Sequence, residues 1–268
     1  MIVMKKMLFT LLTVFICLFG VSQQMQGKVT YERTSQMQIM INDNGQGDQP
    51  LSRTITDKFE LLFGNNQSLW HMSDEETPPD EQMGGAVQIR MIGGGADDVS
   101  FYDFTTGTSK EQREVFGKKF IITDSIEKLN WKLSGETKTL LNQVCQRAAA
   151  QRIGIRMMMN MDNGKMDRKE VSDTSTIVAW FTPDIPVATG PAEYQNQLPG
   201  LILEIDLNNG KQNFKAIELL SNADIAAIKE PKSGKKLTRK EFQKESDKMM
   251  EDMQRNNPGG NRVMRFNN

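Results

Sequence analysis

The sequence has few of the residues that most catalytic and metal sites use. Its 268 residues include one histidine, His71, and two cysteines. A single histidine rules out a histidine-rich metal cage, and no Gly-x-Ser-x-Gly elbow is present to expose a nucleophilic serine. Charge of one sign is also missing: 33 Lys and Arg balance 34 Asp and Glu, for a formal net charge of −1. Nucleic-acid-binding domains are basic and patchy, so we predict no nucleic-acid partner, no cofactor and no enzymatic activity.

The longest apolar run is too short to span a bilayer comfortably. It extends from Met7 to Val21, follows Lys5 and Lys6, and ends in the small residues Gly20-Val21-Ser22. This pattern is typical of a cleaved secretory signal, which we assign to residues 1–22. We therefore expect an exported protein, periplasmic or associated with the outer membrane, with no transmembrane segment after cleavage. Loss of the two lysines would lower the formal net charge from −1 to −3.

The mature chain would contain one cysteine, Cys145, and so could form no intramolecular disulfide. A nucleophilic or redox role would need a neighbour that lowers the thiol pKa, and the nearby sequence offers none. We favour a buried structural cysteine, because a free cysteine behaves as a small hydrophobe.

Short strand-like segments separated by Gly, Asn and Asp turns make up most of the chain. The strongest hairpin signals are Gly64-Asn65-Asn66 and Asn208-Asn209-Gly210, since Asn and Gly supply the positive φ values of tight turns. We predict a mainly β protein (β-rich α+β) with a curved antiparallel sheet or half-barrel over residues 23–222. The expected strands are Lys28–Ile41, Phe59–Phe63, Ser68–Met72, Ala86–Ile92, Val99–Phe104, Glu114–Phe116, Phe120–Thr123, Leu129–Leu133, Ile153–Met161, Thr174–Phe181, Leu201–Leu207 and Gln212–Leu220.

The C-terminal part is predicted to be helical. Thr238 and Glu241 have the spacing of a capping box that opens a charged helix reaching about Met253. Residues 223–255 would form an arm that packs lightly on the domain or is exposed. Residues 256–268 have the composition of a disordered tail.

A proline-rich linker joins two apolar strands, Val178–Phe181 and Leu201–Leu207. It cannot be helical, because each proline fixes φ and biases the residue before it toward extended geometry. We expect both strands in one sheet, Trp180 in the core, and the linker across an edge or end of the sheet, with Gly200 in a strained turn. The structural motif consists of Pro183, Pro186, Pro191, Pro199, Gly200 and the separate Cys145.

Over residues 130–220 the chain resembles the GLPGLI family, which comprises secreted envelope proteins of Bacteroidota and has no established activity. The name motif reads Gln197-Leu198-Pro199-Gly200-Leu201-Ile202 here, with Gln197 in place of its first glycine. A secreted sheet with a lone strand cysteine is also similar to the half-barrels of lipoprotein carriers, which hold acyl chains on an apolar face; this is an analogy of architecture. The other matching residues are Trp131, Gly135-Glu136-Thr137-Lys138, Cys145, Ala179-Trp180-Phe181-Thr182-Pro183, Ile185-Pro186 and Gly190-Pro191.

Two interpretations compete for residues 136–150. Apolar residues from Leu140 to Ala149 recur with helical spacing. The family resemblance and the strand-like neighbours instead place this stretch in the sheet, which is the interpretation we adopt while leaving the helix open.

Methionine is the one unusual abundance, with 18 in the chain. Met157, Met158, Met159 and Met161 could present soft thioethers to Cu(I). We prefer the interpretation that they line an adaptable apolar surface, with Met157, Met159 and Met161 on one face of a strand, because no Cys or His joins them.

We therefore expect a noncatalytic envelope module that binds an apolar, lipid-like ligand or a protein segment on the concave face of its sheet. The alternative is a structural or assembly partner of an outer-membrane protein, with contacts through the loop of residues 184–197 and the charged helix. Cu(I) binding by the methionines is the third hypothesis. The expected binding residues are Trp180, Phe181, Met157, Met159, Met161, Tyr194 and Leu198.

Overall fold

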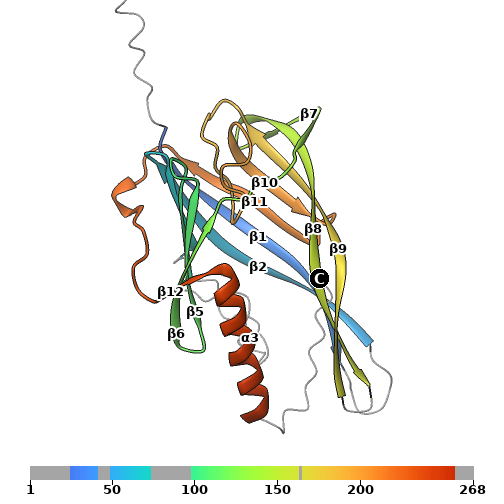
Figure 1. Cartoon of the computed structure of the whole chain (residues 1–268). Coiled ribbons are helices and arrows are strands. Elements are labelled where there is room, and N and C mark those ends of the chain that lie inside the picture. The colour runs from blue at the N-terminus through green and yellow to red at the C-terminus, as the bar shows by residue number, and fades with distance from the viewer. Residues whose placement is uncertain (1–24, 42–48, 74–97, 163–164, 257–268) are drawn as a thin grey trace, which may run out of the picture.

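The computed structural model describes residues 25–41, 49–73, 98–162 and 165–256. They form one open, curved sheet of twelve strands in the order β12-β6-β5-β4-β3-β2-β1-β11-β10-β9-β8-β7, with a C-terminal helix (Figure 1). The predicted mainly β fold is confirmed. The strands are β1 (Gly27–Ile41), β2 (Gln49–Gly64), β3 (Gln67–Met72), β4 (Val99–Asp103), β5 (Thr108–Val115), β6 (Lys118–Ser125), β7 (Lys132–Leu140), β8 (Gln143–Asp162), β9 (Lys165–Thr182), β10 (Leu201–Leu207), β11 (Gln212–Leu220) and β12 (Lys235–Thr238), followed by the helix α3 (Arg239–Asn256); a 3₁₀ turn, η1 (Ile225–Ala227), precedes β12.

Left-handed turns join the hairpins at the predicted places. Asn65 and Asn66 have φ values of 53° and 58°, and Asn208 and Asn209 have values of 53° and 55°. Such values suit the two-residue loop between Gly64 and Gln67, whose twist matches that of the flanking strands, whereas the loop between Leu207 and Gln212 has four residues. Both predicted hairpins are confirmed, whereas the segment Ala86–Ile92, residues 1–24 and residues 257–268 lie outside the described residues.

Residues 136–150 belong to the sheet. β7 and β8 pair as antiparallel neighbours through Leu140↔Gln143, with Leu141 and Asn142 in the turn at φ values of 47° and 60°. The apolar residues from Leu140 to Ala149 show helical spacing because the turn at Leu141 and Asn142 interrupts the alternation of buried and exposed residues, which begins again in β8. The strand interpretation is therefore confirmed.

One pairing breaks the antiparallel pattern that the sequence predicts. β12 runs parallel to β6, with Leu237 beside Ile122, so the sheet is mixed. Parallel strands need a long connection between them, and here it consists of all residues from the end of β6 to the start of β12, 126–234. Four residues containing two lysines give no recognisable strand signal, so β12 was missed.

Different segments of the chain pack on the two faces of the sheet. We define the inner face as the one that carries Leu61, Trp70 and Glu111. Strand register joins these residues, because Leu61 lies opposite Trp70 and both Trp70 and Glu111 lie opposite Ser100. On the outer face, Leu62 packs with Leu69, Phe101, Ala223 and Ile228, so the segment after β11 covers it there.

Helix α3 packs on the inner face beside β6. The rings of Phe242 and Phe120 meet edge to face, with centroids 5.5 Å apart. The predicted capping box is confirmed: the Thr238 backbone nitrogen donates to Glu241 Oε2 at 2.8 Å, and the Glu241 nitrogen donates to Thr238 Oγ1 at 3.3 Å. No helix in the described part of the chain is both long and apolar enough to cross a bilayer.

Candidate functional site

The proline-rich linker crosses the inner face of the sheet. The Ser68 hydroxyl of β3 donates to Gln195 Oε1 at 3.0 Å, and β3 is separated from β10 by three strands. At the near end, the Tyr31 hydroxyl of β1 donates to the Ile202 carbonyl at 2.5 Å. The expectation that the linker crosses an edge or end is therefore wrong, because its apolar side chains Ile185, Tyr194 and Leu198 belong to the main core cluster.

Gln195 holds the linker in shape from inside. Its side chain is fully buried, its Oε1 accepts a hydrogen bond from the Thr189 hydroxyl, and its Nε2 donates to the Gly190 carbonyl. A buried amide whose donors and acceptor are all used fixes a single arrangement of the loop. Sequence reasoning missed this residue, since a glutamine between prolines gives no signal of burial.

Gly200 lies where the main chain of Thr182 and Pro183 comes too close to leave room for a side chain. A Cβ atom at this position would lie 2.2 Å from the Thr182 carbonyl oxygen and 3.1 Å from Pro183 Cα. Its φ is not among the positive values of the described residues, so the expected strained turn is wrong. Among the linker prolines, Pro191 is buried and Pro183, Pro186 and Pro199 are exposed.

The residues expected to bind a ligand do not form one site. Phe181, Tyr194 and Leu198 are 1%, 1% and 4% exposed and pack together in the core, so they line no groove. Trp180 points to the outer face, where it is only partly buried. The Lys138 Nζ lies 4.3 Å from the centre of its ring, so the expectation of a core position is also wrong.

The expected methionine surface lies on the long β8–β9 hairpin. Met157, Met159 and Met161 pair with Glu170, Arg168 and Met166 of β9. Their side chains lie outside the described residues, and Cu(I) binding stays a prediction. Within the described residues, no group of three His, Cys, Asp or Glu side chains is placed to hold a metal ion.

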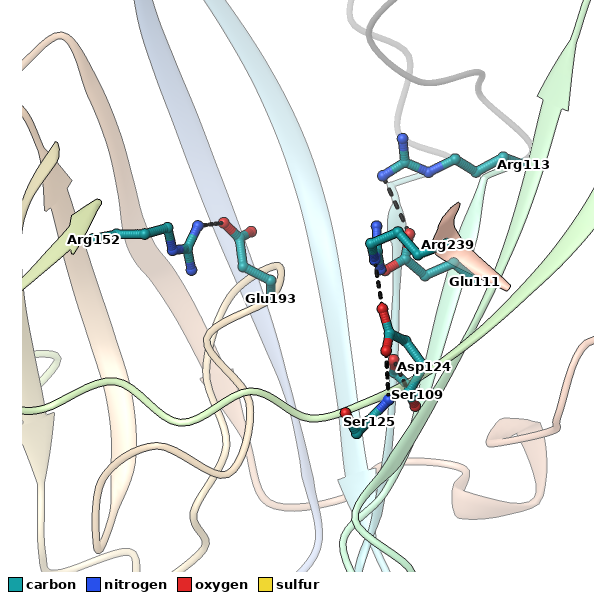
Figure 2. A network of polar contacts seen from close by, with 8 residues as sticks. All are labelled: Ser109, Glu111, Arg113, Asp124, Ser125, Arg152, Glu193 and Arg239. Atoms are coloured by element: carbon teal, nitrogen blue, oxygen red, sulfur yellow. Dashed lines mark hydrogen bonds and ion pairs between the residues drawn. The ribbon is translucent and has the colours of Figure 1, made fainter. Parts of the chain in front are cut away.

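A charged cluster that the sequence did not reveal lies on the inner face (Figure 2). Glu111 of β5 has a side chain only 8% exposed, and its Oε1 accepts a hydrogen bond from Arg239 Nη2 at 2.5 Å. Arg239 Nε donates to Asp124 of β6 at 2.8 Å, and Arg113 Nη2 lies 3.2 Å from Glu111 Oε2. Burial acts to lower the pKa of Arg239, but attraction to Glu111 and bonds to both carboxylates outweigh it, so this pKa is raised.

A second ion pair faces this cluster from the linker side. Arg152 of β8 donates from Nη1 to Glu193 Oε1 at 3.0 Å, and its guanidinium lies 5.4 Å from the ring centre of Tyr194. Tyr102 of β4 lies within electrostatic reach of both groups. Burial raises the pKa of Tyr102, and the charges of Glu111 and Glu193 raise it further. The inner face thus presents two arginine–carboxylate groups, and carboxylates of both act on the pKa of Tyr102.

Two titratable groups of the main core cluster, Cys145 and Tyr194, stay protonated at neutral pH. Burial raises the pKa of Cys145 to about 11 and that of Tyr194 well above its ordinary value. Cys145 is fully buried, which confirms its expected position. A thiol in this state is a poor nucleophile, since the thiolate is the reactive form.

The alternation of β5 contained a weak signal for the charged cluster. Ser109, Glu111 and Arg113 share one strand face, and a long stretch of sequence separates them from Arg239. Nothing in the strand's own residues marks that face as the inner one. The partner in the C-terminal arm could not be found without the parallel pairing of β12.

Comparison with known protein families finds a match to one family, whose function is unknown. A family model described as "Protein of unknown function (Porph_ging)" matches residues 131–204, which include β7, β8, β9, the linker and the start of β10. The resemblance drawn from the sequence is thus supported at the level of an uncharacterised family, while the GLPGLI name stays a prediction. No curated protein matches this chain.

Two solved structures are similar to this chain over most of its length. They are titled "Structure of PNGF-II in C2 space group" and "Structure of PNGF-II in P21 space group", and are 15% and 16% identical to this chain. The matches cover 82% and 81% of this chain and 33% and 32% of the others, with TM-scores of 0.47 and 0.44. This chain therefore spans about a third of the length of those proteins.

Proposed function

We propose that this protein is a noncatalytic module of the cell envelope, exported by its N-terminal signal, that binds an extended protein segment on the inner face of its sheet. The observation that carries the proposal is that the same face carries two arginine–carboxylate groups, Arg152–Glu193 and the Arg239 cluster (Figure 2). Arginine and carboxylate side chains recognise the charged groups of a polypeptide by directional hydrogen bonds.

A lipid-like ligand fits this face less well. The apolar side chains that would line an acyl groove already pack against one another in the core and are not available to a ligand. They are Phe181 of β9 and Tyr194 and Leu198 of the linker. A hydrocarbon chain beside the ion pairs would remove their hydration without replacing it, which is costly. The protein-segment form of the binding hypothesis is therefore the one we adopt.

The location in the envelope rests on the sequence. The signal at residues 1–22 and the resemblance of Gln197–Ile202 to the GLPGLI motif both support an exported protein. Fractionation of the source cells would test the location: recovery of the chain with the cytosol and with residue 1 intact contradicts export.

Native mass spectrometry of the mature protein, gently isolated from its own envelope, tests the binding function. We expect a polypeptide adduct that is lost from the double variant Arg152→Gln/Glu193→Gln. The matched control is Arg147→Gln/Glu136→Gln, which removes an ion pair of 3.2 Å on the outer face. A lipid adduct supports the acyl-binding hypothesis instead, and a bare mass in every preparation contradicts both.

A further inference from the structure

The C-terminal arm, residues 235–256, is held by few contacts. Its strand β12 has four mainly exposed residues, and α3 buries Phe242 against Phe120 and Ile122 with Met249 at the margin of this small cluster. None of the main core cluster comes from the arm. Segments with little buried apolar surface open at a lower free-energy cost than the core of the same protein.

The strongest polar attachment of the arm is the Arg239 guanidinium. It bridges two carboxylates on neighbouring strands, through Nη2 to Glu111 and Nε to Asp124. Glu111 is more than nine-tenths buried, and its Oε2 accepts no hydrogen bond from the described residues, although Arg113 lies near it. Arg239 itself is 50% exposed, so the guanidinium enters the carboxylate pair from the solvent side.

A hollow of about 620 Å³ opens beside this contact. Thr123 and Asp124 of β6 line one side, and Arg239, Gln243 and Lys244 of the arm line the other. The hollow follows the boundary between the sheet and the arm, so solvent and solutes reach Asp124 and Arg239 without unfolding of the core.

We propose that the Glu111–Asp124 pair is a binding site for an arginine side chain of the bound segment, and that Arg239 fills it in the free protein. The arm is then a strap that the segment displaces. This inference rests on the proposed function, because the arginine belongs to the segment on the inner face.

The chemistry of the pair selects guanidinium over ammonium. Two nitrogens of one rigid, planar group reach two carboxylates at once, a geometry that a lysine ammonium cannot reproduce. A buried carboxylate left without a cation is strongly unfavourable, so one guanidinium leaves as the next one arrives. Competition of this kind weakens the binding of the segment. The apparent association constant equals the intrinsic one multiplied by the fraction of molecules in which Arg239 has left the site.

The first test measures binding of the peptide acetyl-Gly-Arg-Gly-amide to the mature chain by calorimetry at low ionic strength. We expect Arg239→Gln to bind it about tenfold more tightly than the unaltered protein, because the competing group is gone. Lys248→Gln is the matched control, since it removes one positive charge from an exposed position of the same helix outside the lining of the hollow, and it should change the affinity little. Equal or weaker binding by Arg239→Gln, or equal binding of the lysine analogue of the peptide, overturns the proposal.

A locked arm provides the second test. Thr123 and Thr238 are exposed register partners in the β6–β12 pair, so Thr123→Cys/Thr238→Cys can be joined by a disulfide. The oxidised form should bind the arginine peptide about tenfold more weakly than the same protein after reduction. Equal affinities of the two forms overturn the strap.

The two proposals fail in different ways. A polypeptide adduct that the locked and reduced forms retain equally leaves the binding module standing and removes the strap. Tighter peptide binding by Arg239→Gln, without any polypeptide adduct in the envelope preparation, supports the arginine site and removes the proposed function.

Discussion

Gly200 is a residue at which the backbone leaves no room for a side chain. All three atoms nearest to a Cβ placed there belong to the main chain of Thr182 and Pro183, so no side chain can rotate away. Gly200→Ala should lower the free energy of unfolding by about 2–3 kcal/mol, measured in urea. Gly154→Ala is the control, because nothing lies within 4 Å of its Cβ position, and a similar loss there would contradict the steric explanation.

Tyr31 is the second residue whose substitution gives a defined result. Its hydroxyl is fully buried, burial raises its pKa far above the ordinary value, and it donates to the Ile202 carbonyl at 2.5 Å. Tyr31→Phe should lower the free energy of unfolding by about 1–2 kcal/mol, because the carbonyl loses its donor without access to water. An unchanged urea midpoint would show that another donor replaces the hydroxyl.

At the scale of the element, the start of α3 should respond to acid. Hydrogen bonds from the Thr238 backbone nitrogen and hydroxyl lower the pKa of Glu241 below its ordinary value, and Lys235 and Lys244 add to this. The stabilisation is therefore present above the unfolded pKa of about 4.3 and is lost as the pH falls through the lower folded value. Hydrogen exchange of the first turn of α3, corrected for its intrinsic rate, should accelerate as the pH falls from about 5 to about 3.

Glu241→Gln serves as the control for that prediction. The amide keeps an oxygen that can accept from Thr238 but has no charge to lose, so the acid-dependent part of the exchange should be smaller. The same acceleration in this variant would assign the effect to other carboxylates of the arm.

Elements differed in how well their sequences specified them. β10 and β11 follow from alternation and an Asn-Asn-Gly turn, and their bounds match the predicted ones. The second half of β8 was predicted directly as Ile153–Met161, but its first part could be found only through its neighbours, since the apolar residues there imitate a helix until Leu141 and Asn142 are placed in a turn. β12 could not be found at all, because its pairing with β6 depends on tertiary contacts of the arm.

At the scale of the whole molecule, the arm should be separable from the main core. Trp70, Trp131 and Trp180 all belong to or pack against the main cluster, so tryptophan fluorescence reports on this cluster alone. A chain ended at Gly234 should keep a cooperative fluorescence transition. Its free energy of unfolding should be lower by about 3 kcal/mol, through exposure of Phe120 and Ile122 and loss of Phe242.

An exposed-tryptophan spectrum of the shortened chain in buffer would contradict this separation. It would show that the arm is required for the sheet to form, and the strap could not then be displaced without unfolding.

The fold class, the hairpins and the helix cap could be predicted because each depends on residues close together in sequence. The candidate site could not. Arg152–Glu193 and Arg239–Glu111 join residues 41 and 128 positions apart, and charge pairs at such distances leave no local pattern. The apolar linker residues were recognised as important, but their burial was mistaken for a binding surface.

The central position of β1 has a consequence for how the chain reaches its final shape. One of its two neighbours, β11, comes from the far part of the chain, and the Thr30–Glu218 contact joins residues 188 positions apart. Sheets dominated by such distant pairings fold slowly, since the chain loses the entropy of closing a long loop before the stabilising contacts form. β1 therefore has one uncovered edge until the chain as far as β11 is available to pair with it. Until then it is an exposed strand edge in need of protection from other unfinished chains.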